Sequence, residues 1–236
     1  MVATTRSSRS LLSFLFSMKH ETCIKTGEIT LKFDALLVSY LNEKLFKPSA
    51  IVSLSQYLDS MQKWNKTYNL TAVTTPHEMV VLHILDSLVI QPFISGKRII
   101  DVGSGAGLPG IPLAIINPDK QFVLLDSNHK KTRFLTQAQI ELGLKNIEIV
   151  CDRVEKYKPT QCFDHVITRA FASLDDVLIK TQHLCCHQGT FLAMKGTYPK
   201  EEIQSIPDQF VVQKAEQLHV PDLNAERHLV IIEFKN

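Results

Sequence analysis

The sequence lacks several features that would assign it to a special class of protein. It has no run of about 18 apolar residues, the length that a membrane-spanning helix needs. Glycine and proline, at 9 and 10 of 236 residues, are too few for a fibrous or low-complexity chain, and no internal repeat is present. Because 44% of the residues are hydrophobic and 21% are charged, the chain has enough apolar surface to fold. We expect one large globular domain, or one domain with a small appendage.

Cysteine is too sparse and too irregularly spaced to build a disulfide framework or a zinc site. We therefore expect reduced thiols, no metal and a cytoplasmic location. Cys151 and Cys162 are expected to be small, buried and unreactive. The five cysteines contain no C-x-x-C pair and include two neighbours that are poorly placed to bridge each other: Cys23, Cys151, Cys162, Cys185 and Cys186.

The charge of the chain does not by itself indicate a nucleic-acid binder. The formal net charge is +2 and the isoelectric point is about 8.2. The excess of basic side chains lies in the first 70 residues, where a polyanion could dock. Residues 1–30 are basic, serine-rich and only briefly apolar, so we expect a disordered or over-extended tail rather than an export signal.

Helical patterns fill the segment that follows this tail. Apolar residues recur at helical spacing from Leu31 to Phe46 and again from Ile51 to Trp64. Thr75 and Pro76 are typical of a helix start, and Glu78 is placed to complete a capping box. Residues 31–90 are therefore expected to form a helical N-terminal cap.

Short apolar strands alternate with helix-length segments in the rest of the chain. The first five predict a parallel sheet that is covered by helices on both faces. The loop between the last two is too short for a crossover helix, so these two are expected to pair antiparallel. Residues 91–236 are thus predicted to form an α/β, Rossmann-like domain with a seven-stranded, mostly parallel sheet. The predicted strands are 98–102, 121–126, 147–151, 164–168, 190–194, 210–212 and 229–232.

A glycine-rich segment, DVGSGAGLPG (101–110), follows the first predicted strand. Glycines at this point allow a tight turn and a close backbone approach to a ligand. Asp126 ends the next strand, where an acidic residue can bind the hydroxyls of a ribose. The segment contains a literal G-x-G-x-x-G, which leaves a nicotinamide cofactor open. The early turn at Gly103 and the missing N–H of Pro109 favour instead the S-adenosylmethionine pocket of class I methyltransferases.

Eight blocks of sequence follow one another along the chain: WNKTYNLTAV (64–73), HILDSL (83–88), DVGSGAGLPGIPLAI (101–115), LLDSNHKK (124–131), RVE (153–155), TRAFASL (168–174), MKG (194–196) and ERHLV (226–230). In this order they resemble the bacterial RsmG family of small-subunit ribosomal RNA guanine-N7 methyltransferases, also called the glucose-inhibited division protein B (GidB) family. The resemblance covers the chain from about residue 31 to its end.

The resemblance implies an S-adenosylmethionine-dependent enzyme that methylates N7 of a single guanosine, at position 527 in standard 16S rRNA numbering. Its partner would be 16S rRNA or the small ribosomal subunit. Nothing in the sequence suggests an obligate oligomer, so a monomer is expected. The resemblance implies cofactor contacts at Gly103, Leu108, Val154, Glu155 and Arg169, and the ribose argument adds Asp126.

This reaction asks little of the enzyme's own acids and bases. Guanine N7 carries a lone pair and no proton, so no general base is required and alignment can supply much of the rate. Arg169 is the one candidate catalytic residue, placed beside the cofactor carboxylate or an RNA phosphate. The alternatives are a methyltransferase that acts on a small molecule or a protein, a nicotinamide-dependent oxidoreductase, and an RNA-binding module without activity.

Several further side chains are assigned from their place in the sequence. Trp64 continues an apolar stripe and is expected to pack in the cap, and His83 and Asp86 are expected to form a local structural pair. Tyr68 could stack on a splayed base. The hypothesis for a phosphate-contacting face comprises Lys63, Lys66, Lys97, Arg98, Lys130, Lys131 and Arg133.

Overall fold

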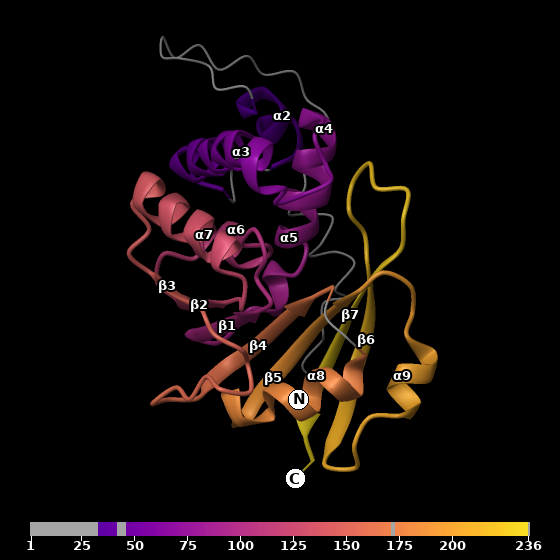
Figure 1. The fold of residues 1–236 in the computed structure, drawn as a ribbon. Helices are drawn as coiled ribbons and strands as arrows, with labels where there is room; N and C mark the ends of the chain where they lie inside the picture. Colours follow the sequence, from indigo (N-terminus) through magenta and orange to yellow (C-terminus); the bar gives the residue numbers. More distant parts are fainter. Residues whose placement is uncertain (1–32, 42–45, 171–172, 236) are drawn as a thin grey trace, which may run out of the picture.

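The computed structural model describes residues 33–41, 46–170 and 173–235, and the predicted tail 1–30 lies outside these ranges. Seven strands form one sheet in the order β3-β2-β1-β4-β5-β7-β6. Helices pack against both faces of this sheet (Figure 1). The α/β architecture and the seven-stranded, mostly parallel sheet are therefore confirmed.

The pairing of the strands follows the predicted pattern. Strands β1 to β5 pair parallel, and β7 pairs antiparallel with both β5 and β6. Strands β5, β6 and β7 are longer than predicted, because their added residues are partly exposed and break the apolar run. The bounds are β1 (Arg98–Val102), β2 (Gln121–Leu125), β3 (Ile147–Val150), β4 (Phe163–Arg169), β5 (Cys185–Lys195), β6 (Phe210–Leu218) and β7 (Arg227–Phe234).

Strand β1 lies where the order of the strands reverses, with β2 on one side and β4 on the other. In an open parallel sheet, the loops that leave the carboxyl ends of two such strands turn to opposite faces and leave a crevice between them. The glycine-rich loop leaves β1 at this point. The topology alone therefore places the predicted ligand site at the carboxyl ends of β1 and β4.

The two faces of the sheet are covered by separate apolar clusters. Ile99 of β1 joins the cluster with α6 (Gly110–Ile116) and α7 (His129–Leu142), whereas Ile100 joins the cluster with α8 (Leu174–Thr181). Neighbouring residues of a strand face opposite sides, so a continuous apolar run is buried on both. Two short helices complete this part: η3 (Gln182–Leu184) and α9 (Lys200–Gln204).

The N-terminal helices lie over α6 and α7 (Figure 1). Their buried side chains belong to the same apolar cluster as those two helices, so the cap is packed directly onto the sheet domain. The described part of the first predicted helix is shorter than expected, and residues 42–45 lie outside the described ranges. The cap consists of α2 (Asp34–Tyr40), α3 (Pro48–Tyr68), α4 (Pro76–Met79), η1 (Val80–Leu85), α5 (Asp86–Leu88) and η2 (Gln91–Phe93).

Local signals in the cap are confirmed, with one exception. The Thr75 hydroxyl accepts the backbone N–H of Glu78 at 3.3 Å and donates to its carboxylate at 2.6 Å, and Pro76 is the first helical residue. Trp64 is partly buried against the apolar cluster, as predicted. The exception is the segment η1, which is a π-helix rather than an α-helix. The apolar pattern of the sequence does not distinguish the two kinds of helix over so short a segment. Among the described residues, no helix is long and apolar enough to cross a membrane.

Candidate functional site

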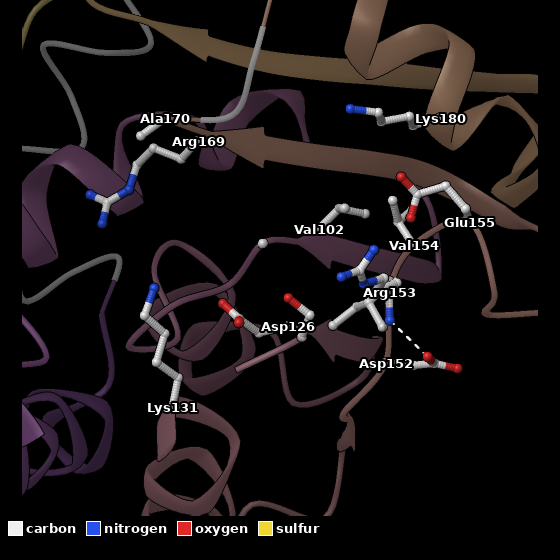
Figure 2. Close-up of a pocket in the computed structure, with 13 residues that line it drawn as sticks. Val102, Asp126, Lys131, Asp152, Arg153, Val154, Glu155, Arg169, Ala170 and Lys180 are labelled. Carbon is white, nitrogen blue, oxygen red and sulfur yellow. Dashed lines mark hydrogen bonds between the residues drawn. The ribbon is translucent and has the colours of Figure 1, made fainter. Parts of the chain in front are cut away.

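A cavity of about 440 Å³ opens at the carboxyl ends of the central strands. This size falls in the range of small-molecule sites. In the view of Figure 2, Asp126, Lys131 and Arg169 surround one end of the cavity, and Glu155 and Lys180 lie at the other. We name this site the first cavity; its lining residues are Val102, Gly103, Leu125, Asp126, Ser127, Lys131, Asp152, Arg153, Val154, Glu155, Arg169, Ala170 and Lys180.

The glycine-rich loop forms one wall of the first cavity. Gly103 has a φ of 74° and Gly107 a φ of 91°, a left-handed conformation that side chains disfavour. A Cβ on Gly107 would also lie 2.6 Å from the Ile111 side chain. The loop is held from the cap, because the buried Tyr57 hydroxyl donates to the Ala106 carbonyl at 2.6 Å. Burial also raises the pKa of Tyr57 well above its usual value, which keeps this donor protonated.

Asp126 joins the loop to the end of β2. One carboxylate oxygen accepts the Gly105 N–H at 2.8 Å, and the other accepts the Asn128 N–H at 2.8 Å. A carboxylate can accept about four hydrogen bonds, so two sites remain for ligand hydroxyls. The next turn starts α7, where the Asn128 side chain accepts the N–H of Lys130 at 2.9 Å. Asp126 therefore both shapes the loop and presents acceptors to the cavity.

Five of the six predicted cofactor contacts line the first cavity, and Leu108 does not. Leu108 is 4% exposed and packs in the apolar cluster with the cap. The predicted contacts in the lining are Gly103, Asp126, Val154, Glu155 and Arg169. Sequence reasoning missed Ser127, Asp152, Arg153 and Lys180. The first three lie two or three residues after the last residue of β2 or β3, a position that could have identified them, whereas Lys180 on α8 carries no such signal.

The predicted RNA-contacting residues separate into three places. Trp64 packs against Phe134 and the Ser60 hydroxyl donates to Glu141 at 2.7 Å, so α3 and α7 run antiparallel. This arrangement brings Lys66 and Tyr68 to the end of α7 that carries Lys130, Lys131 and Arg133, and Lys131 also lines the first cavity. Lys63 lies farther back along α3. Lys97 and Arg98 lie apart from the other predicted RNA-contacting residues. They are at the amino end of β1, whereas the cavity is at its carboxyl end.

Arg169, at the end of β4, makes an ion pair that sequence reasoning did not foresee. Its Nη1 lies 3.2 Å from one carboxylate oxygen of Asp86 and donates to the Leu82 carbonyl at 3.3 Å. The Nε of Arg227 lies 2.7 Å from the other Asp86 oxygen. The predicted pairing of Asp86 with His83 is wrong, because His83 instead contacts the Thr71 hydroxyl at 3.0 Å.

Asp101 lies at the end of β1 and is completely buried. One oxygen accepts the Gly110 N–H at 2.9 Å, and the other has no hydrogen-bond partner. Burial raises the pKa of Asp101 to about 7, although the Gly110 N–H and the charge of Arg169 act in the opposite direction. The Asp101 carboxylate holds the end of the glycine-rich loop through the Gly110 N–H and does not line the cavity.

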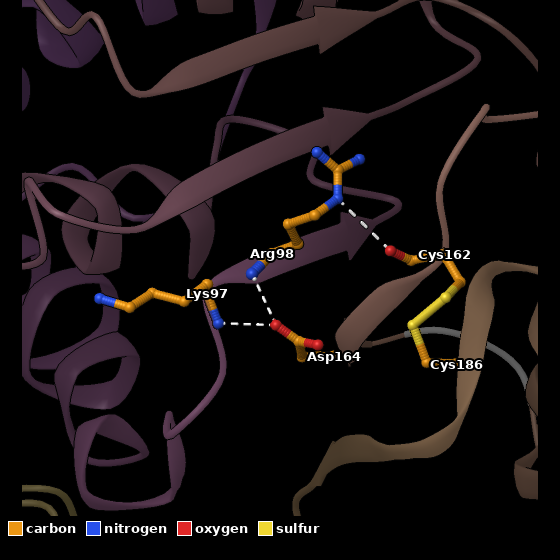
Figure 3. The surroundings of a disulfide bond; sticks show 5 residues. All are labelled: Lys97, Arg98, Cys162, Asp164 and Cys186. Atoms are coloured by element: carbon orange, nitrogen blue, oxygen red, sulfur yellow. Dashed lines mark hydrogen bonds between the residues drawn. A yellow bond between two sulfur atoms is a disulfide. The ribbon is translucent and has the colours of Figure 1, made fainter.

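A disulfide at the amino ends of β4 and β5 contradicts the expectation of reduced thiols. Cys162 and Cys186 are joined, with their Cα atoms 5.0 Å apart (Figure 3). Parallel pairing places Phe163 opposite Cys185, so the two bonded cysteines meet although 24 residues separate them. Cys151 is exposed rather than buried as predicted. Spacing along the chain could not reveal either result, because both depend on strand register.

Comparison with solved structures defines the class of this fold. The chain is similar to a ribosomal protein L11 methylase from Lactobacillus delbrueckii subsp. bulgaricus, with a TM-score of 0.51 and 16% sequence identity. The match covers 64% of this chain and 77% of that one. The fold is that of a class I methyltransferase, a class whose cofactor is S-adenosylmethionine.

Comparison of sequences defines the family. The family model described as rRNA small subunit methyltransferase G matches residues 50–230. A Ribosomal RNA small subunit methyltransferase G from Nitrosococcus oceani is 54% identical over 182 residues, which are 77% of this chain and 85% of the relative. One from Salmonella agona is 56% identical over 179 residues, covering 76% and 86%. The chain therefore belongs to the ribosomal RNA small subunit methyltransferase G family, as its sequence blocks predicted.

The raised pKa of Asp101 predicts a specific dependence of stability on pH. Between about pH 4 and pH 7 the folded chain holds a proton on Asp101 that the unfolded chain releases, so the free energy of unfolding should fall as pH rises. The loss is at most about 4 kcal/mol and should stop above pH 7. Urea unfolding of wild type and Asp101→Asn across this range isolates the contribution. Parallel pH profiles of the two proteins would contradict it.

Proposed function

We propose that this chain transfers a methyl group from S-adenosylmethionine to N7 of one guanosine of 16S rRNA, at position 527 in standard numbering. The observation that carries the proposal is the first cavity, where residues after β1, β2, β3 and β4 converge at the switch point of the sheet. Membership of the small-subunit methyltransferase family supports the choice of an RNA acceptor. We further propose that the enzyme acts as a monomer in the cytoplasm.

The residues of the first cavity fit each part of the cofactor. Asp126 offers acceptor oxygens for the ribose hydroxyls, and Val154 offers an apolar contact for the adenine end, with Glu155 beside it. Lys131 and Arg169 supply positive charge for the carboxylate of the methionine end. Gly103 leaves room beside the backbone because no Cβ extends from it. When bound, S-adenosylmethionine supplies a methyl group on a positively charged sulfur.

The acceptor atom explains why no side chain of the site needs to act as a base. Guanine N7 is an unprotonated nitrogen with an in-plane lone pair, so no proton must be removed from it. The work of the chain is to bind, orient and exclude water, which can account for a large part of the rate. Arg169 is suited to positioning, because Asp86 and the Leu82 carbonyl fix its guanidinium group.

The RNA would approach over the end where α3 and α7 meet. Lys66, Lys130 and Arg133 are exposed there, and Lys131 reaches from the same helix turn into the first cavity. Tyr68 stacks on Trp64 with ring centroids 5.0 Å apart, which supports it as a platform at the edge of this surface. We name Lys66, Lys130 and Arg133 the basic edge and propose that it contacts RNA phosphates.

A methyl-transfer assay on small ribosomal subunits tests this function. Purified protein, labelled S-adenosylmethionine and subunits from a strain that lacks the activity are combined, and the digested rRNA is examined by mass spectrometry. We expect N7-methylguanosine at one site. Asp126→Asn should weaken cofactor binding by about tenfold or more, because it loses a charge and an acceptor. The matched control is Asp119→Asn, because Asp119 is an exposed aspartate that pairs with Lys97 near the amino ends of β1 and β2, away from the cavity.

Two results would overturn the proposal in different ways. Cofactor binding without transfer to rRNA would retain the first cavity and reject the ribosomal substrate. Equal cofactor affinity in wild type and Asp126→Asn would reject the assignment of Asp126 to the ribose.

The basic edge predicts how affinity for the subunit depends on salt. Each phosphate contact releases condensed counterions, so removing Lys66 or Lys130 should reduce the slope of log affinity against log salt by about 1. Lys47→Ala is the control, because Lys47 precedes the far end of α3. The measurement is subunit binding between low and physiological salt. An unchanged slope in both edge variants would remove this surface from the RNA interface.

A further inference from the structure

A second cavity, also of about 440 Å³, lies between the cap and the ends of β4, β5 and β7. Apolar atoms form most of its walls, and a few charged groups converge on it. Its lining comes from segments that are far apart in the sequence: Val73, Leu82, His83, Asp86, Arg169, Ala170, Met194, Lys195, Gly196 and Arg227.

The two cavities share a wall. Arg169 and Ala170, at and just after the end of β4, line both. A cofactor with its ribose at Asp126 and its adenine near Val154 must extend its other end past β1 toward β4. The reactive end would then lie beside Arg169, on the side of the shared wall. The second cavity is thus the adjoining space in which an acceptor atom can come close to that end.

We propose that the second cavity receives the target guanine base after it leaves its RNA stack, with Asp86 as the acceptor for the N–H groups of that base. This inference rests on the proposed function and adds the place and the contacts of the substrate. Enzymes that modify a base commonly extrude it into a pocket, where apolar side chains contact its faces and polar groups read its edge. The second cavity has both kinds of lining.

The apolar part of the lining suits the faces of a planar base. Val73 lies in the loop before α4, Leu82 in η1 and Met194 near the end of β5, so the cap and the sheet each contribute. A base that is enclosed between the cap and the sheet would exclude water from the reacting atoms. The basic edge contributes no residue to the second cavity, so variants can test entry of the base and binding of the RNA phosphates separately.

The polar part of the lining suits the edge of guanine. Guanine presents N–H donors at N1 and at its amino group, and Asp86 presents a carboxylate. Arg169 and Arg227 each occupy one oxygen of Asp86, which leaves about two of its four acceptor sites unused. Adenine has no N–H at N1, so the same carboxylate would disfavour it. The arginine pair holds the Asp86 carboxylate in a fixed position while the base enters.

His83 lines the second cavity without adding charge to it. It is buried, and that burial together with the charge of Arg169 lowers its pKa to about 4, although Leu82 and Asp86 act in the opposite direction. His83 is thus neutral near pH 7 and adds no positive charge beside a base that becomes positively charged on methylation. The other charged groups that face it are Arg169, Asp86, Lys195 and Arg227.

Gly196 offers a direct way to fill the second cavity. It is exposed at the end of β5, and a Cβ built on it meets no atom within 4 Å. Gly196→Trp should therefore place a large ring in the second cavity and lower kcat/KM for small subunits by about 100-fold. Ile140→Phe, at an exposed position of α7 that lines neither cavity, should act like wild type. Cofactor affinity and the unfolding temperature should be unchanged in both, because neither change touches the first cavity. The Ile140→Phe variant is the matched control for an added aromatic side chain.

A second variant tests the opposite wall and a third tests the carboxylate. Val73→Trp, in the cap, should reproduce the loss of Gly196→Trp even if the latter folds poorly. Asp86→Asn should raise KM for subunits more than it lowers kcat, since an amide leaves one guanine donor unpaired. A purely structural role of Asp86 would instead lower the unfolding temperature and leave the KM of the folded enzyme for subunits unchanged.

The outcomes separate this inference from the proposed function. If wild-type protein transfers no methyl group to rRNA, the proposed function fails. If wild type is active and both tryptophan variants methylate rRNA at the wild-type rate, the second cavity does not hold the base. Loss of activity in both tryptophan variants with retained cofactor binding supports the inference.

Discussion

The buried carboxylate of Asp86 holds together three parts of the molecule that are distant in sequence. It belongs to the cap, while Arg169 ends β4 and Arg227 begins β7. The Asp86 side chain is only 4% exposed, so its charge is costly without partners, and loss of one partner of such a group commonly costs about 3–5 kcal/mol. The cap, the central sheet and the antiparallel edge therefore share one fixed point beside both cavities.

Further contacts join the cap to the glycine loop and to α7. Tyr57 holds the glycine loop through the Ala106 carbonyl, and α3 packs along α7 through Trp64 and Phe134. The loop that shapes the first cavity is thus supported by the cap, which also contributes four of the ten lining residues of the second cavity. Movement of the cap would alter both cavities together. The proposed contacts of the cap with RNA and the proposed alignment of the cofactor on the sheet would in this way be mechanically connected.

The features that could be predicted from sequence depend on local order along the chain. Strand periodicity, the Thr75 cap and the acid at the end of β2 each lie within a few residues of their signal, and the structure has all three. The Asp86 ion pairs, the Cys162–Cys186 disulfide and the burial of Leu108 depend on which distant segments meet. Register and helix packing decide those, so single-sequence patterns cannot reveal them. Most of the fold and one cavity were therefore predictable, and the second cavity was not.

The orientation of the cofactor is the point on which both cavities depend. A crystal structure of the protein with S-adenosylhomocysteine bound would measure it directly. We expect the ribose hydroxyls on Asp126, the adenine beside Val154 and the sulfur next to the wall formed by Arg169 and Ala170. A ligand bound in the reverse direction, or a sulfur that faces away from the second cavity, would contradict the proposed arrangement.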